Sequence, residues 1–551
     1  MATRAAQEGD VLEPNRPVVR EIAEGQTQSI RVQAGSRQFL RVVMVSWGFE
    51  AEITVYDTQD HIVTLLRSRP EGRTPISLIA PAGGAYRIEI SAVVGGGRYE
   101  IRIDELRPSA TSDRGRLAAE RLFAEAERLK AVETAESIRG AIKKYEEAAT
   151  ILQAVPDPRE EAAARNRIGD LYQILSGSKA FNHYQQALEI SRSTQNKSGI
   201  AEALNNLGYL HFFLGHTQKS FDAAEEALRL SRDVGDRRAE AQALSIIGEA
   251  HYGFGDMAKA LQFQSQALSL WRDLKDGRGQ AQSLVAAGYA YGQMGESRKA
   301  LDCFNEGLKL WKSVKSSRGQ ALTLIALGNI QNKLGEKQQA LNLYLQSKRL
   351  LDPVGDTSYK AYVYAHLARL YRDMGENKVA LEHNQLAVDL FRASGNRWGE
   401  AEGLLGIGRI YSTLGEHRTA LNYYLDALDT FRSLGMSRLQ SQTLRDIGKA
   451  YDALGDRVAA LSYYQRALEI LKVGQDQREK AYTLNYVGSV YEKLGDRAKA
   501  RDYYTQALTL SQSVSDLQGQ ASSLYNLAHL DRFCGELDAA REKIESAIAL
   551  S

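Results

Sequence analysis

The sequence predicts a mostly α-helical solenoid of stacked helical hairpins, preceded by a small antiparallel β-sandwich. Two observations carry this prediction. Glycine and alanine recur every 40 residues from about residue 200 onward, which is the signature of a repeat array. The first 106 or so residues instead contain short runs in which apolar and polar side chains alternate, a pattern typical of strands with one wet face.

Strand character is clearest in two of the N-terminal runs. Residues 86–90 (Tyr-Arg-Ile-Glu-Ile) and 99–103 (Tyr-Glu-Ile-Arg-Ile) alternate strictly. Glycine-rich turn signals separate the runs, including residues 69–72, Ala82-Gly83-Gly84 and Gly95-Gly96-Gly97. Short strands at this spacing favour an antiparallel sandwich. The predicted strands span residues 29–32, 39–45, 52–56, 62–66, 76–79, 86–90 and 99–103.

Small residues set the phase of the repeat. One glycine series falls between predicted helices, where a left-handed turn ends a helix. Its members are Gly215, Gly255, Gly295, Gly335, Gly375, Gly415, Gly455, Gly495 and Gly535. A second series falls inside a helix, where glycine costs about 1 kcal/mol relative to alanine, so two helix backbones are expected to approach closely there. It comprises Gly208, Gly248, Gly288, Gly328, Gly408, Gly448 and Gly488, with Ala368 and Ala528 in the gaps.

Each 40-residue unit is predicted to be two antiparallel helices. In the unit that starts at Ala401, the first helix covers about residues 401–414 and the second about residues 418–434. Neither helix can bury its apolar stripe alone, so the units must stack, and we expect one continuous right-handed superhelix. Nine units start at 201, 241 and so on to 521. A looser tenth unit covers residues 160–196, and an eleventh covers residues 116–155.

At these positions the chain resembles the tetratricopeptide repeat (TPR) family. The family's pattern of small and large residues appears as Leu404, Gly408, Tyr411, Ala420, Tyr424 and Ala427. The proline that usually follows the second helix is absent, and six extra residues lengthen that helix and its loop, as at residues 230–236. In this it is similar to the 40-residue TPR subclass of bacterial signalling proteins and spindle-orientation adaptors.

The order of the parts resembles the N-terminal half of bacterial TPR-CHAT proteins, in which a caspase-like cysteine protease follows the repeats. The β part is similar to a pre-peptidase C-terminal domain. The expected organisation is a flexible N-terminus over residues 1–15, a β-sandwich over 16–107, a helical link or degenerate first TPR over 108–159, and about ten repeats over 160–551. No protease residue can be carried over, since the sequence contains repeats up to Ser551.

Composition predicts neither nucleic acid nor membrane as a partner. The 70 basic and 68 acidic side chains leave a net charge of +2, and no apolar run is long enough to span a bilayer. Walker, HExxH, GxSxG and Rossmann patterns are absent, and Cys303 and Cys534 show no metal-ligand spacing. We therefore expect a protein without catalytic activity, cofactor or metal. No signal core is visible, which favours the cytoplasm, with export behind a removed signal peptide left open.

Family resemblance implies that a protein or peptide binds the concave groove lined by the first helices. Positions 2, 5, 9 and 12 of each unit should face that groove. An aromatic and amide-rich zone comprises Asn205, Tyr209, Phe212, Tyr252, Tyr289, Asn329 and Asn332, and a basic zone comprises Arg369, Arg372, Arg409, Arg445 and Lys449. The basic zone would suit an acidic peptide; alternatively its arginines pair with Glu402, Asp452 and Glu492. The TPR pattern that clamps a chaperone's C-terminal carboxylate is not reproduced.

The leading functional hypothesis is a recognition scaffold, the regulatory or sensor part of a larger bacterial signalling or defence protein. One alternative is the regulatory half of a CHAT protease; another is a surface-binding adhesin that acts through the β domain. The last predicted helix keeps Ala540, Ile544, Ala547, Ile548 and Leu550 at inward phases. An uncovered apolar stripe is unfavourable, so a covering helix and, by resemblance, a CHAT domain are expected to follow.

Overall fold

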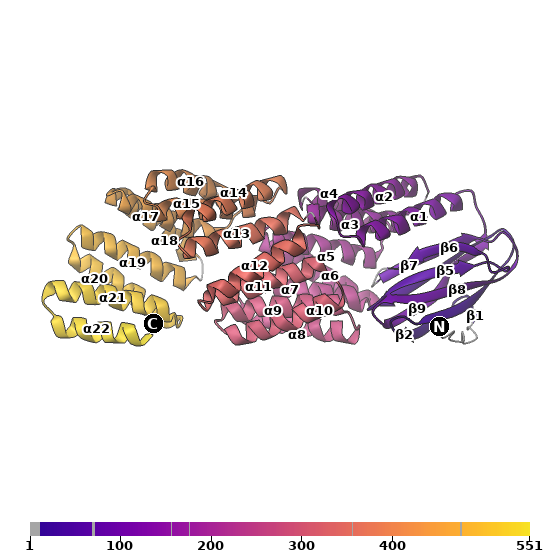
Figure 1. The fold of residues 1–551 in the computed structure, drawn as a ribbon, viewed down its shortest axis with the longest axis horizontal. Helices are drawn as coiled ribbons and strands as arrows, with labels where there is room; N and C mark the ends of the chain where they lie inside the picture. The colour runs from indigo at the N-terminus through magenta and orange to yellow at the C-terminus, as the bar shows by residue number, and fades with distance from the viewer. Residues whose placement is uncertain are drawn as a thin grey trace. The chain divides into compact units, whose positions relative to one another are not determined.

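A computed structural model of the chain describes residues 11–68, 72–155, 157–175, 177–354, 356–473 and 476–550 (Figure 1). Over these residues, nine strands come first and 22 helices follow. The predicted fold class, a solenoid of helical hairpins behind a small β-sandwich, is confirmed. Residues 1–10 of the predicted flexible N-terminus, residues 69–71 of one predicted turn and Ser551 lie outside the described residues.

The strands form two sheets that pack face to face around one apolar core. One sheet has the order β1-β3-β8-β5-β6 and the other the order β2-β9-β4-β7. All pairs are antiparallel except β1 with β3. The strands are β1 (Val11–Leu12), β2 (Val18–Ile22), β3 (Thr27–Ala34), β4 (Gln38–Trp47), β5 (Glu50–Tyr56), β6 (Ile62–Arg67), β7 (Gly72–Ile79), β8 (Gly84–Val94) and β9 (Gly97–Pro108).

All seven predicted strands are present, and each is longer than predicted. Alternation explains the success: Tyr86, Ile88 and Ile90 of β8 are buried in the core, while Arg87 and Glu89 between them are only partly covered. The two strands that the sequence did not reveal, β1 and β2, both lie at a sheet edge. Edge strands bury fewer side chains, so their apolar pattern is weaker.

The helices fall into two compact units, which are described separately. Unit 1 contains residues 1–363 and 393–395, and unit 2 contains residues 364–392 and 396–551. The division falls inside α13 (Thr357–Asp373). The continuous superhelix expected from the sequence stays a prediction.

Unit 1 holds the sandwich and the first six hairpins. Its helices are α1 (Asp113–Lys130), α2 (Ala135–Ala154), α3 (Pro158–Leu175), α4 (Gly177–Ser193), α5 (Lys197–Phe213), α6 (Thr217–Val234), α7 (Arg237–Phe254), α8 (Met257–Asp273), α9 (Gly277–Gln293), α10 (Ser297–Ser313), α11 (Ser317–Lys333), α12 (Lys337–Leu351) and the start of α13. The two looser predicted units correspond to the hairpins α1–α2 and α3–α4.

Unit 2 holds the remaining hairpins. Its helices are the rest of α13, α14 (Asn377–Ala393), α15 (Arg397–Thr413), α16 (His417–Ser433), α17 (Ser437–Ala453), α18 (Arg457–Val473), α19 (Gln477–Lys493), α20 (Arg497–Ser513), α21 (Leu517–Cys534) and α22 (Leu537–Leu550). First helices begin earlier than predicted. In α15, for example, the side chain of Asn396 accepts a hydrogen bond from the Gly399 amide and so caps the helix before residue 401.

First helices of neighbouring hairpins contact one another directly. In unit 1, α5 contacts α7 and α7 contacts α9; in unit 2, α19 contacts α21. Each first helix therefore packs between its own second helix and the first helices beside it. This arrangement makes the first helices the inner layer of each unit.

The glycine that follows each first helix adopts the predicted left-handed turn. All nine members of the series that begins at Gly215 have φ between +79° and +87°. At Gly415 the turn allows the next amide, of Glu416, to donate to the carbonyl oxygen of Tyr411 at 2.9 Å, which closes the helix end. A residue with a Cβ would be strained here.

Five of the seven mid-helix glycines make room for an aromatic ring, which the sequence prediction did not include. A Cβ at Gly408 would lie 2.5 Å from Cε1 of Tyr424 and 3.2 Å from the carbonyl oxygen of Ala420. Phe304 approaches Gly288 in the same way, also at 2.5 Å. The nearest neighbour at these two glycines is thus an aromatic side chain of the second helix. At Gly408 the backbone of that helix also comes close, as the sequence predicted.

The apolar stripe predicted at the C-terminal end is partly exposed. In α22, Ala540 and Ala547 are buried, whereas Ile544 and Ile548 are 40% and 68% exposed. A helix that covers this stripe stays a prediction. Among the described helices, none combines the length and the apolar character needed to cross a bilayer.

Candidate functional site

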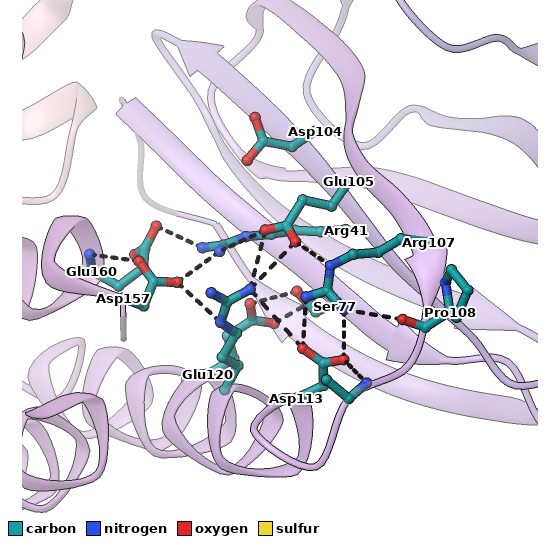
Figure 2. A network of polar contacts seen from close by, with 12 residues as sticks. Arg41, Ser77, Asp104, Glu105, Arg107, Pro108, Asp113, Glu120, Asp157 and Glu160 are labelled. Atoms are coloured by element: carbon teal, nitrogen blue, oxygen red, sulfur yellow. Dashed lines mark hydrogen bonds and ion pairs between the residues drawn. The ribbon is translucent and has the colours of Figure 1, made fainter. Parts of the chain in front are cut away.

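An ion-pair network joins the sandwich to the first helices of unit 1 (Figure 2). Arg41 points out of β4, and its side chain is almost fully buried. Its guanidinium donates to Asp157 and to Glu160, each at 2.8 Å, at the start of α3. Arg73 of β7 adds a second cation, which bonds to Glu160 and, at 2.9 Å, to Asp104. Two strands are thereby tied to one helix N-terminus.

A second part of the network fixes the start of α1. Arg107 at the end of β9 donates two hydrogen bonds, of 2.8 and 2.9 Å, to the buried carboxylate of Asp113. Burial alone would raise the pKa of Asp113, but the hydrogen bonds from Arg107 hold it below the ordinary value. The ion pair makes the passage from strand to helix rigid, because a broken pair would leave a buried charge.

Glu120 of α1 is a further member of this network. Its carboxylate accepts hydrogen bonds from the backbone amide of Ser77, at 3.0 Å, and from the Ser77 hydroxyl, at 2.6 Å. Burial raises the pKa of Glu120 to about 7, while Arg41 and Ser77 oppose the shift. A cavity of about 40 Å³ lies beside these groups, room for one or two waters. The charged groups of this network pair with one another, which indicates a structural role.

The sandwich contacts the repeats at a second place as well. Lys275, in the turn between α8 and α9, pairs with Glu21 of β2 at 3.1 Å. A Cβ at Gly48, in the turn between β4 and β5, would lie 2.7 Å from the carbonyl oxygen of Lys275. The sandwich therefore spans from the first hairpin to the turn between α8 and α9 of unit 1.

Four tyrosines gather on the inner layer of unit 1, and together we name them the tyrosine cluster: Tyr209 of α5, Tyr252 of α7, Tyr289 of α9 and Tyr359 of α13. The rings of Tyr252 and Tyr289 lie 6.5 Å apart. Tyr209 hydrogen-bonds to Tyr359, and their interaction, followed by burial, raises the pKa of Tyr209 well above its ordinary value. Tyr289 is 37% exposed, so the cluster remains open to solvent there.

Tyr359 reaches the cluster because the start of α13 packs back against α5. The ring of Phe213 contacts the rings of Tyr359 and Tyr362 edge to face, at 6.0 and 6.1 Å. Just before α13, Val354 lies in one buried cluster with Ile168 of α3. Segments that lie far apart in the sequence thus pack together on the inner layer of unit 1.

Arg318 and Asp356 form an ion pair where α13 packs against α5. Arg318 Nε lies 3.0 Å from Asp356 Oδ2, and the Asp356 side chain is fully buried. The guanidinium also lies over the ring of Tyr359, 4.5 Å from its centroid. A tyrosine face and a carboxylate together hold one cation here.

Glu249 lies in the same neighbourhood without such a cation. It comes from α7, one turn before Tyr252, and it interacts electrostatically with Tyr209. Its Oε2 atom is buried and has no hydrogen-bond partner among the described residues. Burial raises the pKa of Glu249 to about 8. A carboxyl of this kind is costly to keep charged unless a cation comes to it.

The inner layer of unit 2 is built of charged pairs. Arg409 lies 2.7 Å from Asp446, and Arg445 bonds to Glu479. Arg372 contacts Asp373 at 2.9 Å. These three arginines of the predicted basic zone form their ion pairs with carboxylates other than Glu402, Asp452 and Glu492, although Glu402 also interacts electrostatically with Arg409.

Two members of the basic zone are more exposed. Arg369 lies 2.7 Å from Nδ1 of His366, and Lys449 lies over the ring of Tyr486, 5.2 Å from its centroid. Glu402 lies near Arg369 and Arg409, and burial raises its pKa although both arginines oppose the shift. Charges of both signs therefore alternate along this face.

Asn205 requires a correction. It is fully buried, and its side-chain amide donates to the carbonyl oxygen of Ala239 at 3.0 Å. Ser245, at the same position of the next unit, also contacts the next first helix, through a hydrogen bond of 3.3 Å between its hydroxyl and that of Ser283. Position 5 therefore faces the next first helix, not a groove, because neighbouring first helices lie closer together than the periodicity alone suggests.

The other residues of the predicted aromatic zone are partly exposed on first helices. Tyr209, Tyr252 and Tyr289 belong to the tyrosine cluster. Asn329 accepts a hydrogen bond from the Tyr344 hydroxyl at 2.7 Å. Phe212 and Asn332 lie near the ends of α5 and α11. A role for any of them in binding stays a prediction.

Sequence analysis missed Glu249, Tyr359, Arg318 and Asp356. A signal existed for Glu249, because it occupies position 9, the phase of Tyr209 and Tyr289. No local signal marks the other three, which precede their units and meet the cluster only through the packing of α13 on α5.

These features define the class as a helical-hairpin repeat protein with a β-sandwich in front. The model of the tetratricopeptide repeat matches residues 160–233, 239–313, 357–433, 400–472 and 479–551. The chain belongs to the tetratricopeptide repeat family. No curated protein sequence matches it.

Several solved structures resemble the chain. A Rap protein in complex with competence and sporulation factor is 14% identical, with a TM-score of 0.48, and the match covers 64% of this chain and 98% of that one. The apo form of RapI is 15% identical, with a TM-score of 0.41 and coverages of 49% and 97%. A STAND-class signal transduction ATPase with a TPR sensor, from Pyrococcus horikoshii, is 15% identical, with a TM-score of 0.45 and coverages of 67% and 52%.

Proposed function

We propose that the chain is a recognition scaffold that binds a protein segment or peptide on the inner layer of unit 1, at the tyrosine cluster. One observation carries the proposal: α5, α7, α9 and α13 bring four tyrosines and a carboxyl without a hydrogen-bond partner at Oε2 to one partly open face. Tyrosines anchor interfaces because they bury a large apolar ring and keep a polar hydroxyl. A repeat scaffold holds such side chains in fixed positions, so little order has to be created on binding.

A selection from random peptides tests the proposal. A phage library of random twelve-residue peptides is selected on the immobilised chain, and the affinity of the enriched peptides is measured by fluorescence anisotropy. The double variant Tyr252→Leu/Tyr289→Leu should weaken binding at least tenfold, since interface tyrosines contribute about 2 kcal/mol or more each. Tyr525→Leu, an exposed tyrosine in unit 2, is the control and should leave the affinity unchanged. Failure to enrich any peptide, or equal affinity for both variants, would contradict the proposal.

A regulatory or sensor role in a larger bacterial protein, and a place beside a CHAT protease, follow only from the resemblance in the order of sandwich, helical link and repeats. A cytoplasmic site of action is supported by the sequence alone. An acidic partner for unit 2 would have to compete with the carboxylates that already pair with Arg409 and Arg445.

A further inference from the structure

At the predicted groove positions of four repeats in unit 1, the charged residues are all acidic. Positions 2, 5, 9 and 12 of the units that start at 201, 241, 281 and 321 include two acidic residues, Glu202 and Glu249, and no basic residue. Glu202 is exposed at the edge, whereas Glu249 lies among the tyrosines with its Oε2 atom buried. A ligand that covers this face meets a carboxyl that a cation would cause to ionise, and π-electron faces that attract cations.

The protein itself shows how such a site is filled. Arg318 lies over the ring of Tyr359 while Asp356 supplies the carboxylate. Tyr209 is close to this trio and to Glu249, because Tyr359, Glu249 and Arg318 all act on its hydroxyl. One cation thus serves Asp356, and Glu249 is the second carboxyl of the same neighbourhood, with no cation of its own among the described residues.

We propose that Glu249 and the tyrosines beside it form a subsite for the ammonium or guanidinium group of a lysine or arginine side chain in the bound peptide. This inference rests on the proposed function, and it names the chemistry that the peptide must present. The carboxylate pairs with the cation, and the ring of Tyr252 or Tyr289 covers the alkyl stem and the charge.

The subsite predicts that binding releases a proton. Burial raises the pKa of Glu249 to about 8, so the free protein holds this carboxyl protonated at pH 7. A bound cation stabilises the carboxylate, and the proton then leaves to the buffer. Glu249 interacts electrostatically with Tyr209 of α5, which also interacts with Tyr359 of α13 and Arg318 of α11. The other titratable groups of this neighbourhood are Tyr252 of α7, Tyr289 of α9 and Asp356, which pairs with Arg318.

A peptide selection with two matched variants tests the subsite. The random twelve-residue library is selected on the unmodified full chain, on Glu249→Gln and on Glu202→Gln. Lysine or arginine should be enriched at one peptide position with the unmodified chain and with Glu202→Gln, and this enrichment should disappear with Glu249→Gln. The affinity of a selected peptide should fall about 10- to 100-fold in Glu249→Gln. The loss is no larger because, in the unmodified chain, the free energy needed to ionise the carboxyl at pH 7 offsets part of what the buried ion pair contributes to binding.

Proton release gives an independent readout. Calorimetric titration of the selected peptide at pH 7 in phosphate and in Tris should show release of close to one proton with the unmodified chain and none with Glu249→Gln. Substitution of norleucine for the enriched lysine in the peptide should remove the release as well.

The outcomes separate the two proposals. Enriched peptides without a basic position, or an enriched lysine whose affinity is equal in Glu249→Gln, would overturn the subsite and leave the proposed function standing. Absence of any enriched peptide would overturn both. Titration with spermidine tests whether a free amine, instead of a peptide side chain, supplies the cation. Tight, Glu249-dependent binding of spermidine without peptide binding would also overturn the assignment to a peptide.

Discussion

The two units share one scaffold but differ in what their inner layers present. Unit 1 presents four tyrosines and a carboxyl whose Oε2 has no hydrogen-bond partner among the described residues. Unit 2 presents arginines that pair with carboxylates of the next first helix, as Arg409 does with Asp446. Charges that are already paired gain little from a ligand. An aromatic face with one unpaired buried acid can gain a partner for that acid when a ligand binds.

A stripe of basic residues in the sequence therefore need not form a basic surface. Arg409 and Arg445 were visible in the sequence, but their partners Asp446 and Glu479 lie 37 and 34 residues away on the next first helix. A repeat period of 40 residues brings such partners together. In repeat arrays of this kind, a binding surface is therefore better sought where charged side chains have no partner of opposite charge on the neighbouring repeat.

Overpacking of the scaffold should have the largest effect, and it should be equal in the two units. Gly288→Leu in unit 1 and Gly408→Leu in unit 2 each place a side chain where Phe304 or Tyr424 lies within 2.5 Å of a Cβ position. Each should lower the free energy of unfolding by about 3 kcal/mol or more. Urea unfolding followed by circular dichroism measures the loss, with Thr413→Leu at the exposed end of α15 as the control. An unchanged midpoint for either glycine variant would show that the units do not share this packing.

Removal of one arginine from each inner layer should lower the free energy of unfolding by different amounts in the two units. Arg318→Met in unit 1 leaves the buried carboxylate of Asp356 unpaired and should cost about 3 kcal/mol. Arg409→Met in unit 2 should cost about 1 kcal/mol, because Arg409 is 36% exposed and Arg445 remains 4.0 Å from Asp446. Chemical unfolding of both variants provides the comparison. The double variant Arg318→Met/Asp356→Asn should recover most of the loss; if it does not, the ion pair is not the cause.

Glu249→Gln should change the pH dependence of stability by a smaller amount. The pKa of Glu249 in the folded protein is about 8, above the ordinary 4.5, so the unfolded chain loses this proton first as pH rises. Folding is therefore weakened progressively between pH 4.5 and 8, and the penalty is complete above pH 8. Glutamine should make the protein more stable than the unmodified chain by roughly 1–3 kcal/mol at pH 9 and by almost nothing at pH 4. Thermal unfolding at the two pH values measures this, and an equal difference at both would contradict the assigned pKa.

Periodicity explains which features could be predicted from the sequence. The left-handed glycines, the hairpins and the seven longer strands follow from local rules of backbone conformation and burial, so they were visible. Asn205 was misplaced because helical periodicity gives a direction but not the distance to the next helix. Tyr359 and Arg318 were missed because they join the cluster through contacts between segments distant in sequence, such as Tyr359 with Phe213.

Hydrogen exchange tests most directly the claim that the ligand site is on unit 1. A peptide selected on the full chain is added at saturating concentration, and deuterium uptake is compared with and without it by mass spectrometry. Protection should appear in the segments that contain Tyr209, Glu249 and Tyr289, and uptake in α15 and α17 should not change. Protection confined to α15 and α17, around Arg409 and Arg445, would place the ligand on unit 2 and contradict the account.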